Sequence, residues 1–217
     1  MTIAKFRIPV LLGTAMLVIA AALVAAGLNN WTGFGFDTTS PEMSRLTQAL
    51  ALKAGTIVAD VGAGKGGLTR VLAEAVGPGG RVFSTEVDPD RLTALRAMRD
   101  AGNLRNVTIV EANARDSGLP AGCCDAIVLR RVYHHVTDPL ETNASLLRAL
   151  RPGGLLAVID MPPPVFIGRG SFGVPVQNVV NEVTASGFEM VQLHSDWPGR
   201  GPLESYCALF RKPLQQL

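Results

Sequence analysis

Apolar and polar positions along residues 41–217 form short patterns of two alternating kinds. Short segments typical of strands, rich in apolar residues, occur at residues 56–61, 81–87, 107–110, 125–130 and 155–160. Between them lie patterns of helical period, as in residues 65–76, whose leucines and valines recur on one face. A helix at 176–186 and two further strands, FEMVQL and ESYCALF, complete the series. This alternation predicts an α/β fold, Rossmann-like and doubly wound, with a mostly parallel sheet covered on both faces.

A polar residue followed by proline marks the start of three of the predicted helices. The dipeptides are Ser40-Pro41, Asp88-Pro89 and Asp138-Pro139. In each, the polar side chain can cap the free amide groups of the first turn, and proline suits the first helical position. We expect these helices to end at about Leu52, at about Ala101 and before Pro152, respectively.

A separate, continuously apolar stretch precedes this pattern at residues 8–28. Its 21 residues carry no charge, and as a helix they would span about 30 Å, the thickness of a bilayer core. Lys5 and Arg7 come before it. The stretch is therefore interpreted either as a signal peptide, with Ala26 as a cleavage position, or as an uncleaved membrane anchor. A buried core helix is the third interpretation.

The charges on either side of this stretch predict its orientation. The next basic residue is Arg45, so the positive-inside rule keeps the N-terminus in the cytoplasm and puts the globular part outside it. We therefore expect a membrane-anchored or exported protein, periplasmic if the source is bacterial, with anchoring at the cytoplasmic face left open. Residues 29–40, rich in Gly, Asn and Thr, are expected to be a linker.

The composition indicates one globular domain, at residues 41–217, behind this segment. Of the 217 residues, 47% are hydrophobic and 18% are charged, which excludes a disordered chain. A net charge of +2 with interspersed signs argues against a nucleic-acid-binding surface. The three cysteines form neither a disulfide framework nor a zinc spacing, so we expect no metal site, and Cys124 is expected to pack as a small hydrophobe. No pattern indicates an oligomeric state.

Glycines and acidic residues gather where the first two strands end, the edge at which doubly wound sheets bind ligands. The sequence there reads DVGAGKGG from Asp60, and its glycines permit a tight turn and a close approach to a ligand. Gly62-x-Gly64-x-x-Gly67 matches the dinucleotide-binding pattern. Glu86 ends the second strand, where it can accept hydrogen bonds from a ribose. Asp60 favours a ligand with an ammonium group over a pyrophosphate.

Four segments in this order resemble the class I S-adenosylmethionine-dependent methyltransferases. They are VADVGAGKGG, FSTEVDPD, NARDSGLPAGCCDAIVLRRVYHHV and LLRALRPGGLLAVID. The resemblance covers about residues 41–211 and is closest to the small-molecule group that includes quinone-biosynthesis C-methyltransferases. It implies a seven-stranded sheet of order 3-2-1-4-5-7-6 whose last strand is antiparallel, with S-adenosylmethionine as the cofactor.

The resemblance also implies roles for individual residues. The methionine moiety is assigned to Asp60, Gly62 and Gly64, the ribose to Glu86, and the adenine to Asn113 and Ala114. Gly66 and Arg130 complete the predicted cofactor-binding set. Many members of the family have an acid where Asn113 stands, although an amide can also bond to the adenine edge. His134 and His135 are the candidates for a catalytic base, because histidine titrates near neutrality.

Three functions remain open at this point. The first is methyl transfer to a small-molecule or lipid-like acceptor, and the second is an NAD(P)-dependent oxidoreductase, which the glycine pattern also allows. The third is a membrane-tethered domain of this fold without catalysis. The Asn/Asp-Pro-Pro-aromatic signature of nucleic-acid amino-methylases is missing after the fourth strand, which disfavours that activity. Residues 161–175, rich in Pro and Gly, are expected to cover the acceptor.

Overall fold

The computed structural model describes residues 40–163, 173–198 and 205–214. The apolar stretch, the linker up to residue 39 and most of the expected acceptor cover lie outside these described residues. Within them, no helix has the length and apolar character needed to cross a membrane.

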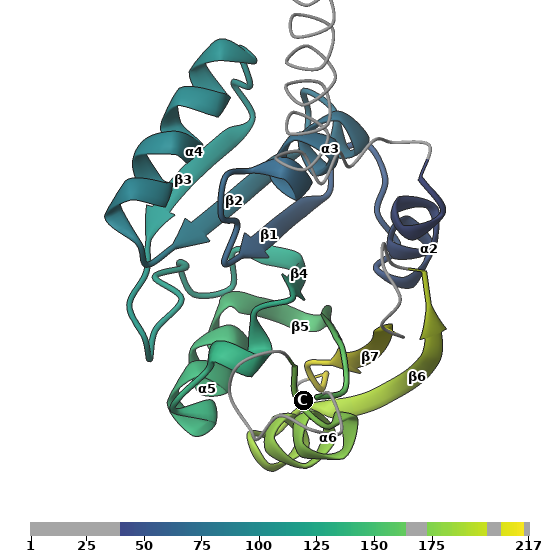
Figure 1. The fold of residues 1–217 in the computed structure, drawn as a ribbon. Helices are drawn as coiled ribbons and strands as arrows, with labels where there is room; N and C mark the ends of the chain where they lie inside the picture. Colours follow the sequence, from purple (N-terminus) through teal and green to yellow (C-terminus); the bar gives the residue numbers. More distant parts are fainter. Residues whose placement is uncertain (1–39, 164–172, 199–204, 215–217) are drawn as a thin grey trace, which may run out of the picture. The chain divides into compact units, whose positions relative to one another are not determined.

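The described chain forms one seven-stranded sheet (Figure 1). Its strands are β1 (Ile57–Val61), β2 (Arg81–Glu86), β3 (Val107–Glu111), β4 (Cys124–Arg130), β5 (Leu150–Asp160), β6 (Glu189–Trp197) and β7 (Ser205–Arg211). The order is β3-β2-β1-β4-β5-β7-β6. Strands β1 to β5 pair in parallel, whereas β7 is antiparallel to both of its neighbours. The predicted strand order and the antiparallel last strand are confirmed.

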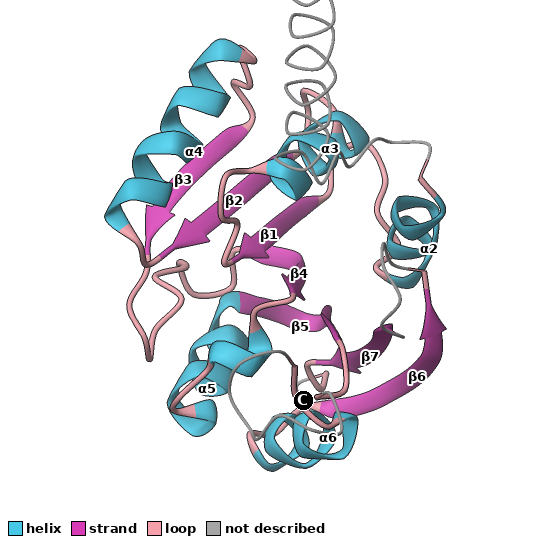
Figure 2. Cartoon of the chain, in the orientation of Figure 1, coloured by secondary structure: helices cyan, strands magenta, loops and turns pink. Residues whose placement is uncertain are grey.

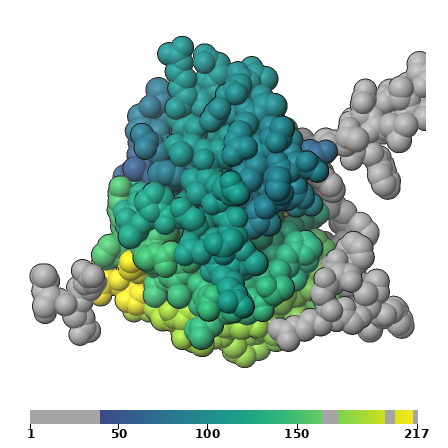
Figure 3. Space-filling view, turned by 90° about the vertical axis from the view of Figure 1, so that its left-hand side faces the viewer, coloured from purple at the N-terminus to yellow at the C-terminus, as the bar shows by residue number. Residues whose placement is uncertain are grey.

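Helices cover both faces of this sheet (Figure 2). They are α2 (Pro41–Ala49), α3 (Gly67–Val76), α4 (Pro89–Ala101), α5 (Pro139–Ala149), α6 (Val176–Ala185) and the short 3-10 helix η1 (Tyr133–His135). Apolar residues of α2 and α3 share one core with Val58, Val128 and Ala157 of the sheet. Residues of α5 and α6 share the other core with Ile127 and Leu156. Figure 3 views the molecule from the side of α4 and shows the teal segments of the chain above the green ones.

The predicted helix caps are present. Oxygens of Ser40, Asp88 and Asp138 accept hydrogen bonds from amide groups in the first turns of α2, α4 and α5, at 3.2, 2.8 and 3.2 Å. Helix α2 ends at Ala49, earlier than the predicted Leu52. The physical reason is a turn toward β1, in which Ala51 adopts a left-handed φ of 50°.

Two expectations about the region around β4 were wrong. Strand β5 begins at Leu150 and runs through the Pro-Gly-Gly segment that we expected to precede it, because Leu150 pairs with Cys124 across an irregular register. The structure also joins Cys123 and Cys124 in a disulfide, which the absence of a cysteine framework did not predict. Packing of Cys124 in the core is confirmed, since its exposed fraction is 0%.

Candidate functional site

A pocket of about 440 Å³ opens at the carboxyl ends of β1 to β4. Six residues of the predicted site line it: Gly62, Glu86, Asn113, Ala114, Arg130 and His135. The other four predicted residues, Asp60, Gly64, Gly66 and His134, do not line it. Asp60 is buried, and the amide of Gly64 donates to the pocket residue Glu86. Gly66 is the N-cap of α3, with a φ of 85°, and His134 contacts Asp160. The structure therefore gathers the predicted set at one edge of the sheet.

The glycine loop between β1 and α3 forms one side of the pocket. Gly62 has a φ of 72°, and a Cβ added there would lie 2.5 Å from Cγ2 of Val132. Its amide and that of Ala63 donate to the carbonyl oxygen of Thr85 at 3.0 and 2.9 Å. Gly64 has a φ of 59°, with no atom within 4 Å of the position of a Cβ. The left-handed backbone and the close packing against Val132 therefore require glycine at position 62. At Gly64, the lack of a side chain leaves space beside the loop.

Glu86 connects the glycine loop to the end of β2. Its side chain is buried, with 2% of the residue exposed. One carboxylate oxygen accepts from the amide of Gly64 at 2.8 Å, and the other accepts from the amides of Val87 and Asp88 at 2.8 and 3.2 Å. Each carboxylate oxygen has two lone pairs, so the oxygen that accepts from Gly64 keeps one lone pair with which it can accept a hydrogen bond from a ligand.

Asp60 lies beneath the loop and is 2% exposed. Its Oδ2 accepts a hydrogen bond from the hydroxyl of Thr69 at 2.7 Å. Burial raises the pKa of Asp60 to about 6, although the Thr69 hydrogen bond and the charge of Arg130 act in the opposite direction. A cation placed nearby would lower this pKa, because a cation favours the ionised form of the carboxyl group.

A buried ion pair joins α2 to the end of β4. Nε and Nη2 of Arg130 donate to the two oxygens of Glu42 at 2.7 and 2.9 Å, and both side chains are about a tenth exposed. The following residue, Arg131, also lines the pocket and has a φ of 56°, unusual for a residue with a side chain. Sequence reasoning missed both Glu42 and Arg131. Glu42 precedes the quoted segments, and Arg131 lies within one of them at a position to which no role was assigned.

The two histidines of η1 have different environments. Nδ1 of His134 lies 2.9 Å from Oδ1 of Asp160, a fully buried residue at the end of β5. The same carboxylate accepts from the amides of His134 and Met161 at 3.2 and 2.9 Å. His135 lines the pocket, with its ring centroid 4.0 Å from that of His134. Burial, and secondarily the charge of His134, lowers the pKa of His135, which favours its neutral form.

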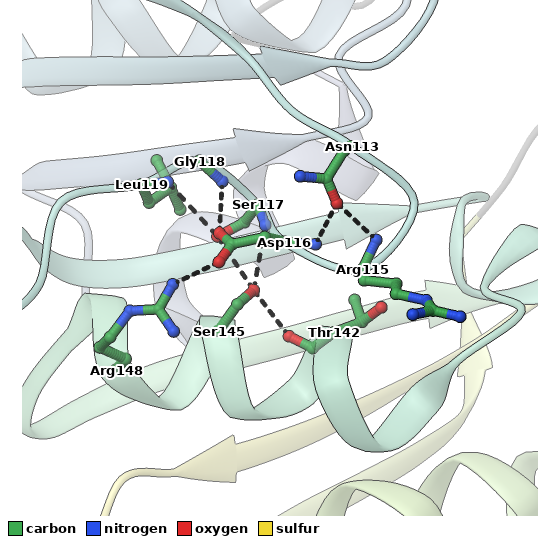
Figure 4. Close-up of polar contacts among 9 residues, drawn as sticks. All are labelled: Asn113, Arg115, Asp116, Ser117, Gly118, Leu119, Thr142, Ser145 and Arg148. Carbon is green, nitrogen blue, oxygen red and sulfur yellow. Dashed lines mark hydrogen bonds and ion pairs between the residues drawn. The ribbon is translucent and has the colours of Figure 1, made fainter.

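Asn113 begins the segment that forms the far wall of the pocket. Its Oδ1 accepts from the amides of Arg115 and Asp116, both at 2.9 Å (Figure 4). The carboxamide oxygen is therefore engaged within the segment, and Nδ2, which can only donate, is turned away from these two amides. Thr85, which sequence reasoning missed, also lines the pocket. Its hydroxyl is buried and has no hydrogen-bond partner among the described residues.

Comparison with known proteins gives one family and a consistent fold. Residues 59–158 match a family model described as "Methyltransferase domain". The ubiquinone/menaquinone biosynthesis C-methyltransferase UbiE of Vibrio vulnificus (strain YJ016) is 35% identical over 115 residues, which are 52% of this chain and 44% of that protein. The chain thus spans less than half of the length of this curated relative.

Two solved structures show the same fold at low sequence identity. A SAM-dependent methyltransferase from Aquifex aeolicus superposes with a TM-score of 0.68 at 20% identity, covering 77% of this chain and 88% of that one. Phosphoethanolamine N-methyltransferase 2 of Haemonchus contortus, solved in complex with S-adenosyl-L-methionine, gives a TM-score of 0.66 at 14% identity. That match covers 79% of this chain and 52% of the other.

Proposed function

Since this chain contains a class I S-adenosylmethionine-dependent methyltransferase domain, we propose that it transfers a methyl group from S-adenosylmethionine to a small-molecule acceptor. The observation that carries the proposal is the pocket at the carboxyl edge of the sheet. It combines a glycine loop, a buried ribose-type carboxylate and an amide side chain, all at the positions that the family resemblance predicts.

Three features of the pocket support a cofactor of this kind. A Cβ at Gly62 would crowd the wall, Glu86 is buried with its carboxylate at the pocket, and the hydroxyl of Thr85 has no described partner. In the proposed complex, Glu86 binds the ribose diol, Asn113 and Ala114 contact the adenine, and the carboxylate of Asp60 stabilises the ammonium group. The cofactor supplies a methyl group already activated by its sulfonium.

The protein then contributes mainly by holding the acceptor in line with this methyl group. Where the acceptor must lose a proton, His135 is the base we propose, because it lines the pocket and its lowered pKa keeps the ring neutral at pH 7. The Asp160 carboxylate at Nδ1 of His134 fixes the orientation of that ring, which in turn packs against His135. His134 is thereby a positioning residue in this proposal.

The acceptor class is proposed from the relatives. Several similar curated proteins are named ubiquinone/menaquinone biosynthesis C-methyltransferases, and we therefore propose a small, lipid-like acceptor of the quinol type. We further propose that residues 8–28 attach the protein to a membrane or export it, on the strength of their uncharged, apolar sequence. Both proposals go together, because a lipid-like acceptor is concentrated in a bilayer.

Binding of S-adenosylhomocysteine, measured by calorimetry on the full chain, tests the proposed function. We expect saturable binding that Glu86→Ala weakens at least about tenfold, because a charge-assisted hydrogen bond contributes roughly 1.5–3 kcal/mol. Glu189→Ala, at an exposed site on the edge strand, is the matched control and should leave binding unchanged. A full chain that binds no S-adenosylhomocysteine would refute the proposal.

A second measurement separates the catalytic proposal from a binding module. Transfer of labelled methyl from S-adenosylmethionine to demethylated quinols should occur with wild-type protein and fall strongly in His135→Gln. The oxidoreductase alternative is not favoured, since the family model and the relatives are methyltransferases. Cofactor binding without transfer to any tested acceptor would instead support the membrane-tethered binding domain.

A further inference from the structure

One face of α5 carries three polar side chains that contact the segment between β3 and β4. They are Thr142, Ser145 and Arg148, whose spacing of three residues places them along one side of a helix. Figure 4 shows them together below the segment. Their partners are, in the same order, Ala114, Ser117 and Asp116. We refer to these three side chains as the α5 polar face.

The three contacts differ in burial and in strength. The amide of Ser117 donates to Oγ of Ser145 at 3.0 Å, and these residues are 4% and 1% exposed. Nη2 of Arg148 lies 2.7 Å from Oδ2 of Asp116, with side chains 49% and 42% exposed. The Thr142 hydroxyl donates to the carbonyl of Ala114 at the longer distance of 3.4 Å. The buried serine contact is therefore the one whose loss should cost most, because it satisfies an amide that water does not reach.

The contacted segment between β3 and β4 forms one wall of the pocket. It contains no helix or strand. It is held from within by the Asn113 carboxamide and by Asp116, whose Oδ1 accepts from the amide of Gly118 at 2.8 Å. The other oxygen of Asp116 takes the Arg148 guanidinium. The hydrogen bond from the amide of Gly118, followed by the hydrogen bond and the charge of Arg148, lowers the pKa of Asp116, so this carboxylate is ionised at neutral pH and links the segment to α5.

We propose that the α5 polar face positions this segment for the adenosine half of the cofactor and thereby sets the affinity for that half. The inference rests on the proposed function, in which Asn113 and Ala114 contact the adenine. Ser145 and Arg148 are not among the described residues that line the pocket. They act through the segment, as positioning residues, and a sequence motif for cofactor binding would not include them.

Two ligands that share only part of their structure test this proposal. S-adenosylhomocysteine carries both the adenosine and the amino-acid half, whereas 5′-methylthioadenosine lacks the amino-acid group. Ser145→Ala in the full chain should weaken calorimetric binding of both by the same factor, roughly 5- to 30-fold, since it leaves the Ser117 amide unsatisfied. Asp60→Asn should weaken S-adenosylhomocysteine and leave 5′-methylthioadenosine unchanged.

Matched variants distinguish positioning from a general loss of stability. Ser186→Ala removes the C-cap serine of α6, whose hydroxyl donates to the backbone carbonyl of Glu182 and which does not line the pocket, and it should bind both ligands as wild type does. Arg148→Ala should weaken both ligands less than Ser145→Ala does, and Arg148→Lys should restore part of the loss. This pair keeps the test decisive if Ser145→Ala does not fold.

The outcomes separate this inference from the proposed function. Equal weakening of both ligands by the α5 variants, with Ser186→Ala unchanged, supports the inference. Wild-type affinity in Ser145→Ala and Arg148→Ala, whatever their thermal stability, overturns it and leaves the methyltransferase proposal intact. Weakening of S-adenosylhomocysteine alone also overturns it, because the effect would then lie in the amino-acid half. A wild-type chain that binds neither ligand overturns both proposals.

Discussion

At the scale of one residue, the side chain proposed to bind the ligand, Asp60, lowers the stability of the ligand-free protein when it is ionised. Its pKa in the folded protein, about 6, lies above the ordinary value of 3.8, chiefly because the carboxyl is buried. Its contribution to stability is therefore complete below pH 3.8 and is lost as the pH rises through about 6. Above that pH the protein holds a buried charge that a cationic ligand can compensate.

The first consequence is a pH dependence of binding. S-adenosylhomocysteine affinity should rise between pH 5 and about pH 7 and then level off, because its ammonium group needs the ionised Asp60. Binding of 5′-methylthioadenosine, which has no ammonium, should stay nearly flat. Asp60→Asn should lose the dependence, and His135→Gln should keep it, which removes the other nearby group as the cause. Parallel pH profiles for the two ligands would contradict this assignment.

The second consequence concerns the free energy of unfolding. Asp60→Asn should raise the stability of the ligand-free protein at pH 8, where the native carboxyl is ionised, and change it little at pH 4. Urea unfolding at the two pH values measures this difference. A variant that is destabilised equally at both values would show that the Thr69 hydrogen bond, rather than the buried charge, dominates at this site.

Residues at the pocket could be predicted from sequence where they belong to a local motif. The glycine loop and Glu86 are of this kind, and the pocket contains Gly62 and Glu86. Asp160 could not be predicted as the partner of His134, because the two are 26 positions apart and meet only once β4 and β5 pair. The same holds for Ser145, whose partner segment is known only from the folded structure.

At the scale of elements, a buried ion pair attaches α2 to the pocket. Glu42 binds the guanidinium of Arg130 with two hydrogen bonds, and Arg130 lines the pocket. Glu42→Ala should destabilise the fold by roughly 3 kcal/mol, since it removes the carboxylate from a largely buried arginine. The double variant Glu42→Ala/Arg130→Met should be less destabilised than the single one, because no buried charge then remains there.

Urea unfolding of Glu42→Ala, Arg130→Met and the double variant, compared with wild type as a double-mutant cycle, measures this coupling. Glu74→Ala is the matched control, since Glu74 pairs with Arg70 on α3 with both side chains about half exposed. Its effect should stay below about 1 kcal/mol. Equal costs for Glu42→Ala and Glu74→Ala would show that the α2 ion pair contributes no more than a surface pair.

Elements were predictable where hydrophobic period and cap residues agree. The three helices opened by Ser40, Asp88 and Asp138 start as predicted, because each cap acts within four residues of chain. The start of β5 was not predictable, because the Pro-Gly-Gly segment looks like a turn and becomes strand only by pairing with β4 and β7. Gly153, for instance, donates to the carbonyl of Lys212.

For the whole molecule, the sequence predicted the layer order and the sheet topology, the latter through resemblance rather than through periodicity. Periodicity gives alternating strands and helices, which several doubly wound orders satisfy. The family motifs selected one order, and the structure confirms it. Association with a membrane, and the side on which the domain would then lie, are separate properties that the fold does not determine, and both stay predictions from the sequence around residues 8–28.

Location and cysteine chemistry can be tested together on the whole protein. If the domain lies outside the cytoplasm, the Cys123–Cys124 disulfide should persist there, because thiols in the cytoplasm are kept reduced. C-terminal fusions to one reporter active only outside the cytoplasm and one active only inside it should give signal from the first alone.

Alkylation of the isolated, unreduced protein should then spare both cysteines, and prior reduction should expose Cys123, the less buried of the two. Signal from the cytoplasmic reporter together with alkylated Cys123 would contradict the predicted topology and place the domain in the cytoplasm. The domain would then share a compartment with the supply of S-adenosylmethionine, which removes the main reason to consider a non-catalytic domain.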